Sequence, residues 1–195
     1  MLRFFDLFFS VLALLVLSPF FLLICLLIKL TSKGPIVFKQ TRVGKNNTDF
    51  QLYKFRTMYI NAHNKGLLTV GGRDKRITTV GYYLRKFKLD ELPQLINVIK
   101  GDMSIVGPRP ELRHYVNYYS VEQMRVLNVV PGITDYASIK YRNENELLAK
   151  AKHPEEFYIR HIMPEKIRLN TVFINNPSLK AYFTIIWYTF IGIFK

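Results

Sequence analysis

The stretch 7-LFFSVLALLVLSPFFLLICLLI-28 carries no charged residue, and Ser18-Pro19 interrupts it near its middle. An apolar helix of about 20 residues, at roughly 1.5 Å rise per residue, is long enough to cross a hydrocarbon core of about 30 Å. Proline lacks a backbone N–H and clashes with the preceding turn, so a helix kinks there, and a serine just before it can bind the freed carbonyl. The stretch therefore predicts two half-helices, residues 4–18 and 20–30, in place of one straight helix.

Two membrane arrangements fit these half-helices. Their lengths are roughly 22 Å and 16 Å, so neither half alone crosses the hydrocarbon. A re-entrant hairpin would return Arg3 and Asp6 to the aqueous surface that also holds Lys29. A kinked spanning helix fits as well, because proline occurs in many spanning helices. The basic residues that follow the stretch favour a main domain on the cytoplasmic side.

Composition bounds the rest of the protein. Beyond the apolar stretch, the chain of 195 residues holds enough sequence for one compact catalytic domain but not for a second large one. The formal net charge of +14 requires an acidic partner: nucleic acid, anionic lipid headgroups or phosphorylated small molecules. The apolar stretch favours the last two. The single cysteine, Cys25, allows no internal disulfide, and the four scattered histidines lack metal-ligand spacing, so no zinc site is expected.

After the apolar stretch, the pattern predicts a hairpin and a loop. Residues 36–38 and 50–55 are typical of short strands, and the polar residues 44–47 between them are typical of a turn. Residues 61–76 are polar and rich in glycine, which predicts a mobile loop over the site.

Two helices are expected next. The first begins near Thr79, with one apolar face and with Arg85 and Lys86 pointing outward. Its apolar face consists of Val80, Tyr83, Leu84 and Phe87. The second begins near Asp90, tolerates Pro93 in its first turn, and ends at Gly101.

The second half of the chain reads as mostly helical. Prolines mark loops on either side of residues 111–129, which we interpret as a helix, and helical spacing returns beyond residue 143. The aromatic-rich segment 178–195 closes the chain and is too short to span a membrane comfortably. Its Tyr182, Trp187 and Tyr188 fit a position at the membrane interface, and ordinary core packing explains them equally well.

The pair Asp90-Glu91 is the candidate for chemistry. Acidic residues at a helix start are stabilised by unpaired N–H groups, and many serve only as caps. Neighbouring cations favour a chemical role instead. These cations are Lys54, Arg56, Arg85 and Arg109, the last of them on the proline-fixed loop 107-GPRP-110.

Carboxylates among fixed cations are typical of phosphate chemistry. A carboxylate can attack phosphorus once cations neutralise the phosphoryl oxygens. A neighbouring carboxylate can hold Mg²⁺, which prefers one or two carboxylates together with substrate phosphates and water. The residues themselves therefore suggest that Asp90 is a nucleophile and Glu91 a metal ligand.

The stretch 88-KLDELPQLINVIKGDMS-104, continued by 106-VGPRP-110, resembles the core signature of bacterial sugar transferases, the monotopic phosphoglycosyl transferases. Further blocks agree in order, so the resemblance covers nearly the whole chain. They are Arg3 with Asp6, Ser18-Pro19, 40-QTRVG-44, 54-KFRTM-58, Asp74 with 76-RIT-78, and 131-PGIT-134. The chain is similar to the family's minimal catalytic core, without extra spanning helices or appended domains.

The resemblance implies a reaction and roles for residues. Such enzymes transfer a phospho-sugar from a nucleotide diphosphate sugar, commonly a UDP-sugar, to a polyprenyl phosphate such as undecaprenyl phosphate, and release the nucleoside monophosphate. It implies Asp90 as the nucleophile that forms a phosphosugar-enzyme intermediate, and Glu91 as the Mg²⁺ ligand. It also places Arg85, Lys54 and Arg109 around the phosphates. Arg142 is a weaker candidate for nucleotide contact.

The resemblance also implies a fold. The expected class is α+β and mostly helical, with residues 1–31 as a re-entrant membrane helix broken at Ser18 and Pro19. Residues 32–195 are then a small cytoplasmic catalytic domain with interfacial amphipathic helices, the C-terminal helix among them. The implied location is monotopic, on the cytoplasmic face of the bacterial inner membrane. The expected partners are both substrates and membrane lipids, with no nucleic acid, and a homo-oligomer stays open.

One segment departs from the family pattern. Many members continue after 131-PGIT-134 with glycine, leucine, alanine and glutamine, whereas this chain has 135-DYASIKYRN-143, and Val130 replaces a frequent arginine. These changes leave Asp90-Glu91 intact but put the recognition of base or sugar in doubt.

Two other functions stay open from the sequence. A membrane-anchored basic module that binds anionic lipid or nucleic acid would explain the charge, and a conventional glycosyltransferase would move the sugar alone. The sequence does not name the sugar, or the glycoconjugate, which could be O-antigen lipopolysaccharide, capsule, exopolysaccharide or a protein-linked glycan.

Overall fold

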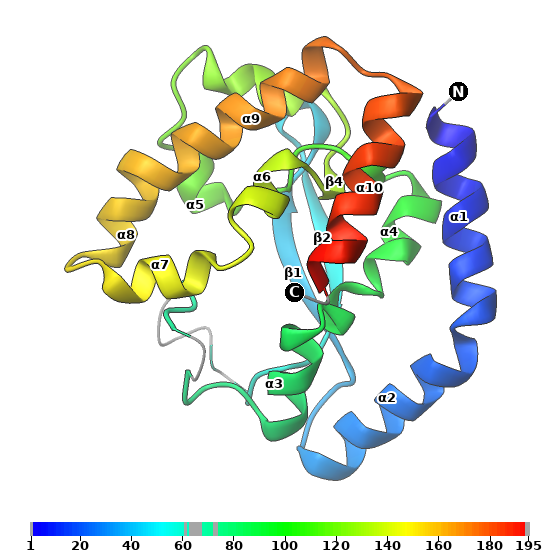
Figure 1. Cartoon of the computed structure of the whole chain (residues 1–195). Coiled ribbons are helices and arrows are strands. Elements are labelled where there is room, and N and C mark those ends of the chain that lie inside the picture. The colour runs from blue at the N-terminus through cyan, green and yellow to red at the C-terminus, as the bar shows by residue number, and fades with distance from the viewer. Residues whose placement is uncertain (1, 61, 63–67, 72–73, 194–195) are drawn as a thin grey trace.

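The computed structural model describes residues 2–60, 62, 68–71 and 74–193 (Figure 1). The described α-helices are α1 (Leu2–Val16), α2 (Ser18–Thr31), α3 (Thr79–Lys86), α4 (Gln94–Lys100), α5 (Arg113–Val116), α6 (Tyr136–Lys140), α7 (Glu144–Lys150), α8 (Pro154–Phe157), α9 (Met163–Asn175) and α10 (Leu179–Ile193). Shorter 3₁₀ turns are η1 (Lys45–Asn47), η3 (Leu89–Glu91) and η4 (Gln123–Asn128), and η5 (Tyr158–Ile162) is a π-helical turn. The strands are β1 (Val37–Val43), β2 (Asp49–Phe55), β3 (Ser104–Val106) and β4 (Gly132–Thr134). The predicted α+β, mostly helical class is confirmed.

The N-terminal helices are broken where the sequence predicts it. α1 and α2 meet at a bend of 64°. Pro19 has no N–H to give to the carbonyl of Leu15, and the hydroxyl of Ser18 donates to that carbonyl instead, at 2.8 Å. Within the described residues, each helix alone is too short or too polar to cross a bilayer, while the bent pair α1–α2 has the length and apolar composition when taken together. A membrane position for this pair stays a prediction.

Strands β1 and β2 form the predicted antiparallel hairpin, paired from Val37 with Phe55 to Val43 with Asp49. The first strand is longer than the sequence indicates. The amide of Asn97 on α4 completes the outer edge of β2, because Oδ1 accepts from Tyr53 N at 3.0 Å and Nδ2 donates to Gln51 O at 2.7 Å. This side-chain amide takes the place of a third strand and ties α4 to the hairpin.

A second sheet pairs β3 with β4 in parallel. The loop predicted at Pro131 and Gly132 is wrong where β4 forms, and the sequence pattern predicted no strand at β3. The two strands approach closely because glycines lie where they meet: a Cβ on Gly132 would lie 2.1 Å from the backbone nitrogen of Gly107. This approach brings the loop that carries Arg109 beside the start of α6.

The predicted helix over residues 111–129 is also wrong. The chain forms only α5 and η4 within that range. The side chains of Ser120 and Gln123 explain the break, because each accepts a hydrogen bond from the other's backbone N–H, at 3.2 Å and 2.9 Å. This reciprocal pair is the pattern that starts a new helical turn.

Helix α3 begins near Thr79, as predicted, and is capped by Thr78, whose hydroxyl accepts from Gly81 N at 2.9 Å. The predicted apolar face is only partly correct, since Leu84 is buried while Tyr83 and Phe87 are exposed. Gly81 lies against the segment that follows β2, where a Cβ would lie 2.1 Å from Thr57 O.

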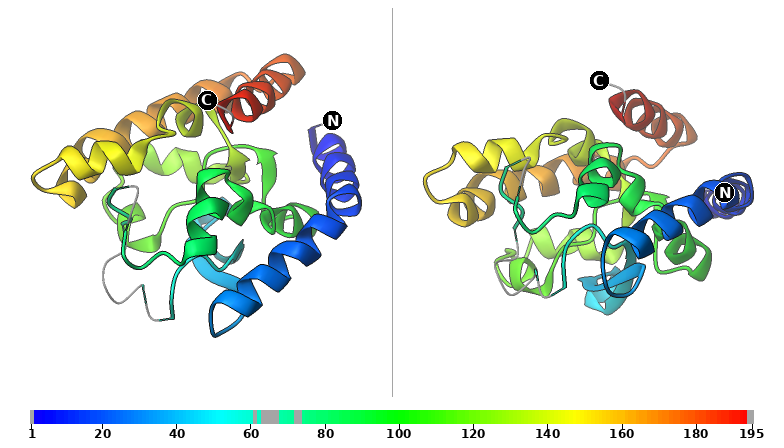
Figure 2. Two further views of the ribbon diagram at one scale, coloured as in Figure 1. Left: turned by 60° about the horizontal axis from the view of Figure 1, so that its bottom comes forward. Right: turned by 90° about the horizontal axis from the view of Figure 1, so that it is seen from below.

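Helices α1 and α2 are fixed to the rest of the protein at their outer ends. Arg56 on the segment after β2 donates to the Ser32 carbonyl and hydroxyl, both at 2.8 Å, just past the end of α2. The buried Asp6 on α1 accepts hydrogen bonds from β3 and from α10. In Figure 2, α8, η5 and α9 form one long helical rod, and α1 and α2 run along another edge of the molecule.

Candidate active site

Asp90 and Glu91 lie on the 3₁₀ turn η3, ahead of α4. The prediction that they open an α-helix is therefore wrong. Pro93 cannot donate to the carbonyl of Leu89, which accepts from Leu92 N at 3.3 Å instead, so regular α-helix starts only at Gln94. Lys88 precedes the turn with φ 57°, a left-handed conformation that a lysine adopts at a cost.

Glu91 is surrounded by cations. Lys54 Nζ lies 3.0 Å from Oε1, and Arg109 Nη1 lies 3.0 Å from Oε2, while Arg109 Nη2 also contacts Oε1. Burial alone would raise the pKa of Glu91, but the charges of Arg109 and Lys54 outweigh it and hold that pKa well below its ordinary value. Glu91 is therefore ionised at neutral pH, and two cations predicted from the sequence meet on it.

Asp90 has a different environment. Its side chain is buried, and its Oδ1 has no hydrogen-bond partner within the described part of the chain. Burial and then the charge of Glu91 raise the pKa of Asp90, against the opposing effect of Lys54 and Arg85. Two adjacent carboxylates thus have opposite pKa shifts, a pattern that is common at functional sites.

The remaining predicted residues are placed as follows. Arg85 is half-buried, not outward as predicted, and its Nη2 donates to Thr69 Oγ1 at 2.9 Å. That contact brings the described part of the predicted loop 61–76 to the site, while positions 61, 63–67 and 72–73 lie outside the described residues. Arg142 is exposed on the turn before α7, beside Gly192 of α10.

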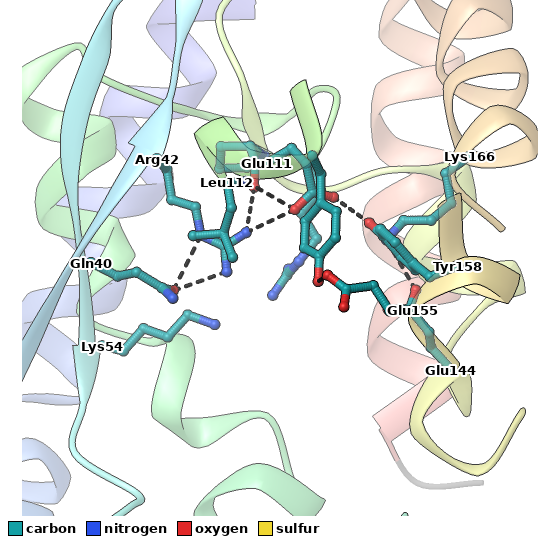
Figure 3. A network of polar contacts seen from close by, with 12 residues as sticks. Gln40, Arg42, Lys54, Glu111, Leu112, Glu144, Glu155, Tyr158 and Lys166 are labelled. Atoms are coloured by element: carbon teal, nitrogen blue, oxygen red, sulfur yellow. Dashed lines mark hydrogen bonds and ion pairs between the residues drawn. The ribbon is translucent and has the colours of Figure 1, made fainter. Parts of the chain in front are cut away.

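Sequence reasoning missed a second layer of polar residues. Arg42 on β1 bonds to Gln40 and to Glu111, and Glu111 bonds to Tyr158 (Figure 3). Asp135 accepts from the backbone N of Arg109 at 2.9 Å. Arg42 lies in the block 40-QTRVG-44 noted above, but Glu111, Asp135 and Tyr158 had no local signal, because their partners are far away in the sequence.

The site offers a limited set of metal ligands. Within the described residues, no group of three or more His, Cys, Asp or Glu side chains is arranged to hold a metal ion. Asp90 Oδ1 has no partner there, and Glu91 Oε2 accepts from Arg109 Nη1 only, so each oxygen keeps acceptor capacity. Two carboxylates suit Mg²⁺ that takes its other ligands from phosphates and water.

An ionised and a buried carboxylate beside lysine and arginine side chains are typical of proteins that handle phosphate esters. Comparison with known families agrees with that class. The bacterial sugar transferase family matches residues 1–195, and the chain belongs to this family.

Characterised relatives support the assignment. The chain is 41% identical over 162 residues to the UDP-N-acetylgalactosamine-undecaprenyl-phosphate N-acetylgalactosaminephosphotransferase of Aeromonas hydrophila. This match covers 80% of this chain and 38% of the relative. It is 40% identical over 161 residues to the UDP-glucose:undecaprenyl-phosphate glucose-1-phosphate transferase of Escherichia coli (strain K12), covering 80% of this chain and 35% of the relative. It is 53% identical over 108 residues to the exopolysaccharide production protein PSS of Rhizobium leguminosarum bv. phaseoli. This match covers 55% of this chain and 54% of the relative. The chain thus spans only 38% and 35% of the length of the first two relatives.

Proposed function

We propose that this chain is a phosphoglycosyl transferase, which moves a phospho-sugar from a UDP-sugar to undecaprenyl phosphate. The names of two relatives state this kind of reaction, one for N-acetylgalactosamine and one for glucose. The reaction would be the first membrane step in building a glycoconjugate.

The observation that carries the proposal is the contrast between Asp90 and Glu91. Glu91 is held by Lys54 and Arg109, whereas the buried Asp90 Oδ1 has no hydrogen-bond partner within the described residues. An unpaired carboxylate oxygen beside cations is what a nucleophile for phosphorus requires.

The proposed reaction has two steps. In the first, an Asp90 oxygen attacks the β-phosphorus of the UDP-sugar, the bond from that phosphorus to the bridging oxygen breaks, and UMP leaves with the bonding electrons. In the second, an oxygen of undecaprenyl phosphate attacks the same phosphorus, and the bond to Asp90 breaks. The products are undecaprenyl diphosphate sugar and the free Asp90 carboxylate.

The basic residues would bind the phosphates. Arg109 and Lys54 both bond to Glu91. Arg85 lies close enough for its charge to lower the pKa of Asp90, so all three cations lie near the carboxylate pair. Positive charge fixed in advance around a phosphoryl group stabilises the charge that develops in the transition state. Arg142 stays a proposed nucleotide contact.

Mg²⁺ is the proposed cofactor. Glu91 is the proposed ligand, because within the described residues its Oε2 accepts only from Arg109 Nη1 and keeps acceptor capacity. When bound, the ion would neutralise phosphate charge during transfer.

The bent pair α1–α2 is proposed to enter one leaflet and return, which places the site at headgroup level on the cytoplasmic face of the bacterial inner membrane. The 64° bend and the apolar side chains on both helices support this arrangement. The exposed apolar residues include Phe4, Phe8, Leu15, Leu22, Leu26 and Leu30, and Trp187 on α10. A lipid phosphate could then reach Asp90 without leaving the membrane.

The experiment is an assay of nucleotide release. The purified full chain in detergent, with Mg²⁺ and undecaprenyl phosphate, is given a panel of nucleotide sugars, with Asp90→Asn in parallel and Asp49→Asn as the exposed control. UMP release that is lost only in Asp90→Asn supports the proposal. UDP release indicates glycosyl transfer, and no release together with tight binding to anionic vesicles indicates a binding module.

A further inference from the structure

The second polar layer behind Arg109 is built around Arg42. Its Nε and Nη2 donate to Gln40 Oε1 at 3.1 Å and 2.9 Å, and its Nη1 donates to Pro110 O and to Glu111 Oε1, both at 3.2 Å. Four of the five N–H groups of a guanidinium are therefore engaged by the protein itself. Little capacity is left for a substrate, so Arg42 is not arranged as a phosphate-binding residue.

Two of the four bonds of Arg42 go to the residues that follow Arg109. The Pro110 carbonyl and the Glu111 carboxylate are held from the β1 side, while Asp135 accepts from the backbone N of Arg109 at 2.9 Å. The backbone on both sides of Arg109 is thus fixed by side chains. The direction of its guanidinium towards Glu91 depends on these anchors.

Glu111 is the centre of this layer (Figure 3). Its Oε1 accepts from Arg42 and from Leu112 N, its Oε2 accepts from the Tyr158 hydroxyl, and its carbonyl accepts from Val43 N at 2.9 Å. The Arg42 and Glu111 side chains are only 19% and 13% exposed. A largely buried ion pair with this many hydrogen bonds favours one geometry over others.

The layer continues to the long helical rod. Tyr158 is the first residue of the π-helical turn, a type of turn that often occurs at functional sites. Lys166 on α9 donates to the Tyr158 hydroxyl at 3.4 Å and to Glu144 on α7 at 3.0 Å. The loop that carries Arg109 is thus linked by hydrogen bonds to β1 on one side and, through Tyr158 and Lys166, to α9 and α7 on the other.

We infer that Arg42 is a positioning residue: through Pro110 and Glu111 it holds Arg109 in the orientation in which the Arg109 guanidinium bonds to Glu91. The inference rests on the proposed function for its kinetic effect but not for its structural one. Arg42→Lys keeps the charge and loses the forked set of donors. A misplacement of the loop by about 1 Å can lower the rate of the chemical step about 100-fold, because the reacting groups lose their alignment.

The test compares Arg42→Lys with Arg113→Lys in the purified full chain. Arg113, the first residue of α5, is a matched control, because it also bonds through both terminal nitrogens, to Asn47 and Asp49 at the turn of the hairpin, but its side chain is 38% exposed. We expect Arg42→Lys to lower kcat about 10- to 100-fold with KM for the UDP-sugar nearly unchanged. Arg113→Lys should match the unaltered chain. An increase in KM with unchanged kcat would instead show that Arg42 contacts the donor and would overturn the inference.

A double variant tests whether Arg42 acts through Arg109. In an Arg109→Lys background the forked grip on Glu91 is already lost, so Arg42→Lys should lower kcat by less than about 2-fold further. If it lowers kcat by the same factor as in the unaltered chain, the two residues act independently and the inference fails.

Hydrogen exchange gives a readout that does not depend on turnover. Arg42→Lys should speed exchange of the backbone amides of Arg109 and Leu112, which the structure pairs with Asp135 and Glu111. Arg113→Lys should not. If the unaltered chain turns over no nucleotide sugar, the proposed function fails, and exchange alone decides the inference: faster exchange supports it and unchanged exchange contradicts it.

Discussion

Tyr182 and Asp6 lie 176 positions apart in the sequence, yet the Tyr182 hydroxyl donates a 2.8 Å hydrogen bond to Asp6 Oδ1 in a buried setting. The same carboxylate accepts from Ser104 Oγ at 2.8 Å and from Ile105 N at 2.9 Å. One side chain on α1 therefore joins the N-terminal helix to β3 and to the C-terminal helix.

The first prediction concerns this junction. Tyr182→Phe removes one hydrogen bond to a buried carboxylate, so we expect a loss of about 1.5–3 kcal/mol in the free energy of unfolding. Thermal unfolding in detergent measures it. Tyr188→Phe, which alters a 55% exposed side chain on the same helix, serves as the control. Equal midpoints for the two variants would show that the junction does not hold α1.

The second prediction concerns the bend between α1 and α2. Pro19→Ala restores an N–H donor for the Leu15 carbonyl, which Ser18 now satisfies, so the segment should straighten and insert more deeply. Cysteines introduced at residue 2 or residue 5, with Cys25→Ser, should then lose labelling by an impermeant maleimide added from the cytoplasmic side. Val16→Ala is the control in the same segment. Labelling that persists in Pro19→Ala would mean that proline does not decide the topology.

The third prediction concerns the conformation of Lys88. Its φ of 57° suits glycine better than lysine, so Lys88→Gly should leave the free energy of unfolding unchanged or raise it by up to about 1 kcal/mol. Lys86→Gly, at the last residue of α3, should lower it by up to about 1 kcal/mol. Chemical denaturation of the two variants gives the comparison. If Lys88→Gly loses as much free energy of unfolding as Lys86→Gly, the backbone at residue 88 is not strained.

The fourth prediction concerns the raised pKa of Asp90. Because its folded-state pKa lies above the unfolded value, ionised Asp90 costs folding free energy above that pKa, and the cost disappears as pH falls below the unfolded value. In metal-free buffer, Asp90→Asn should therefore have a higher Tm than the unaltered chain at neutral pH. The difference should shrink as pH falls towards about 4. A difference that is absent at neutral pH, or that grows on acidification, would contradict the burial of an unpaired carboxylate.

Local signals predicted part of this fold. The helix break follows from Ser18 and Pro19, which act on a carbonyl three or four residues away, and the hairpin follows from its turn. The parallel pair β3–β4 could not be predicted in this way. Each strand has only three residues, and their pairing depends on glycines that let two segments far apart in the sequence come close together. The false helix over residues 111–129 has helical composition, but Ser120 and Gln123 start a new turn within it.

The site residues also fall into those that the sequence predicts and those that it does not. Asp90, Glu91, Lys54 and Arg109 stand out by residue type and by the motifs around them, and the structure brings both cations to Glu91. The pairing of Arg42 with Glu111 joins residues 69 positions apart, so neither residue shows its role locally. The charges of Arg109 and Lys54, which hold the pKa of Glu91 low while that of Asp90 is raised, reach Glu91 only through the tertiary structure.

The central claim is that Asp90 forms a covalent intermediate. The most direct measurement incubates the chain with Mg²⁺ and an accepted UDP-sugar in the absence of undecaprenyl phosphate, followed by rapid acid quench and mass spectrometry of the intact protein and its peptides. We expect a phospho-sugar adduct on the peptide that contains Asp90, formed with stoichiometric UMP, lost on addition of undecaprenyl phosphate and absent from Asp90→Asn. Turnover with no adduct, and UMP release only when the acceptor is present, would contradict the account and indicate direct transfer between the two substrates.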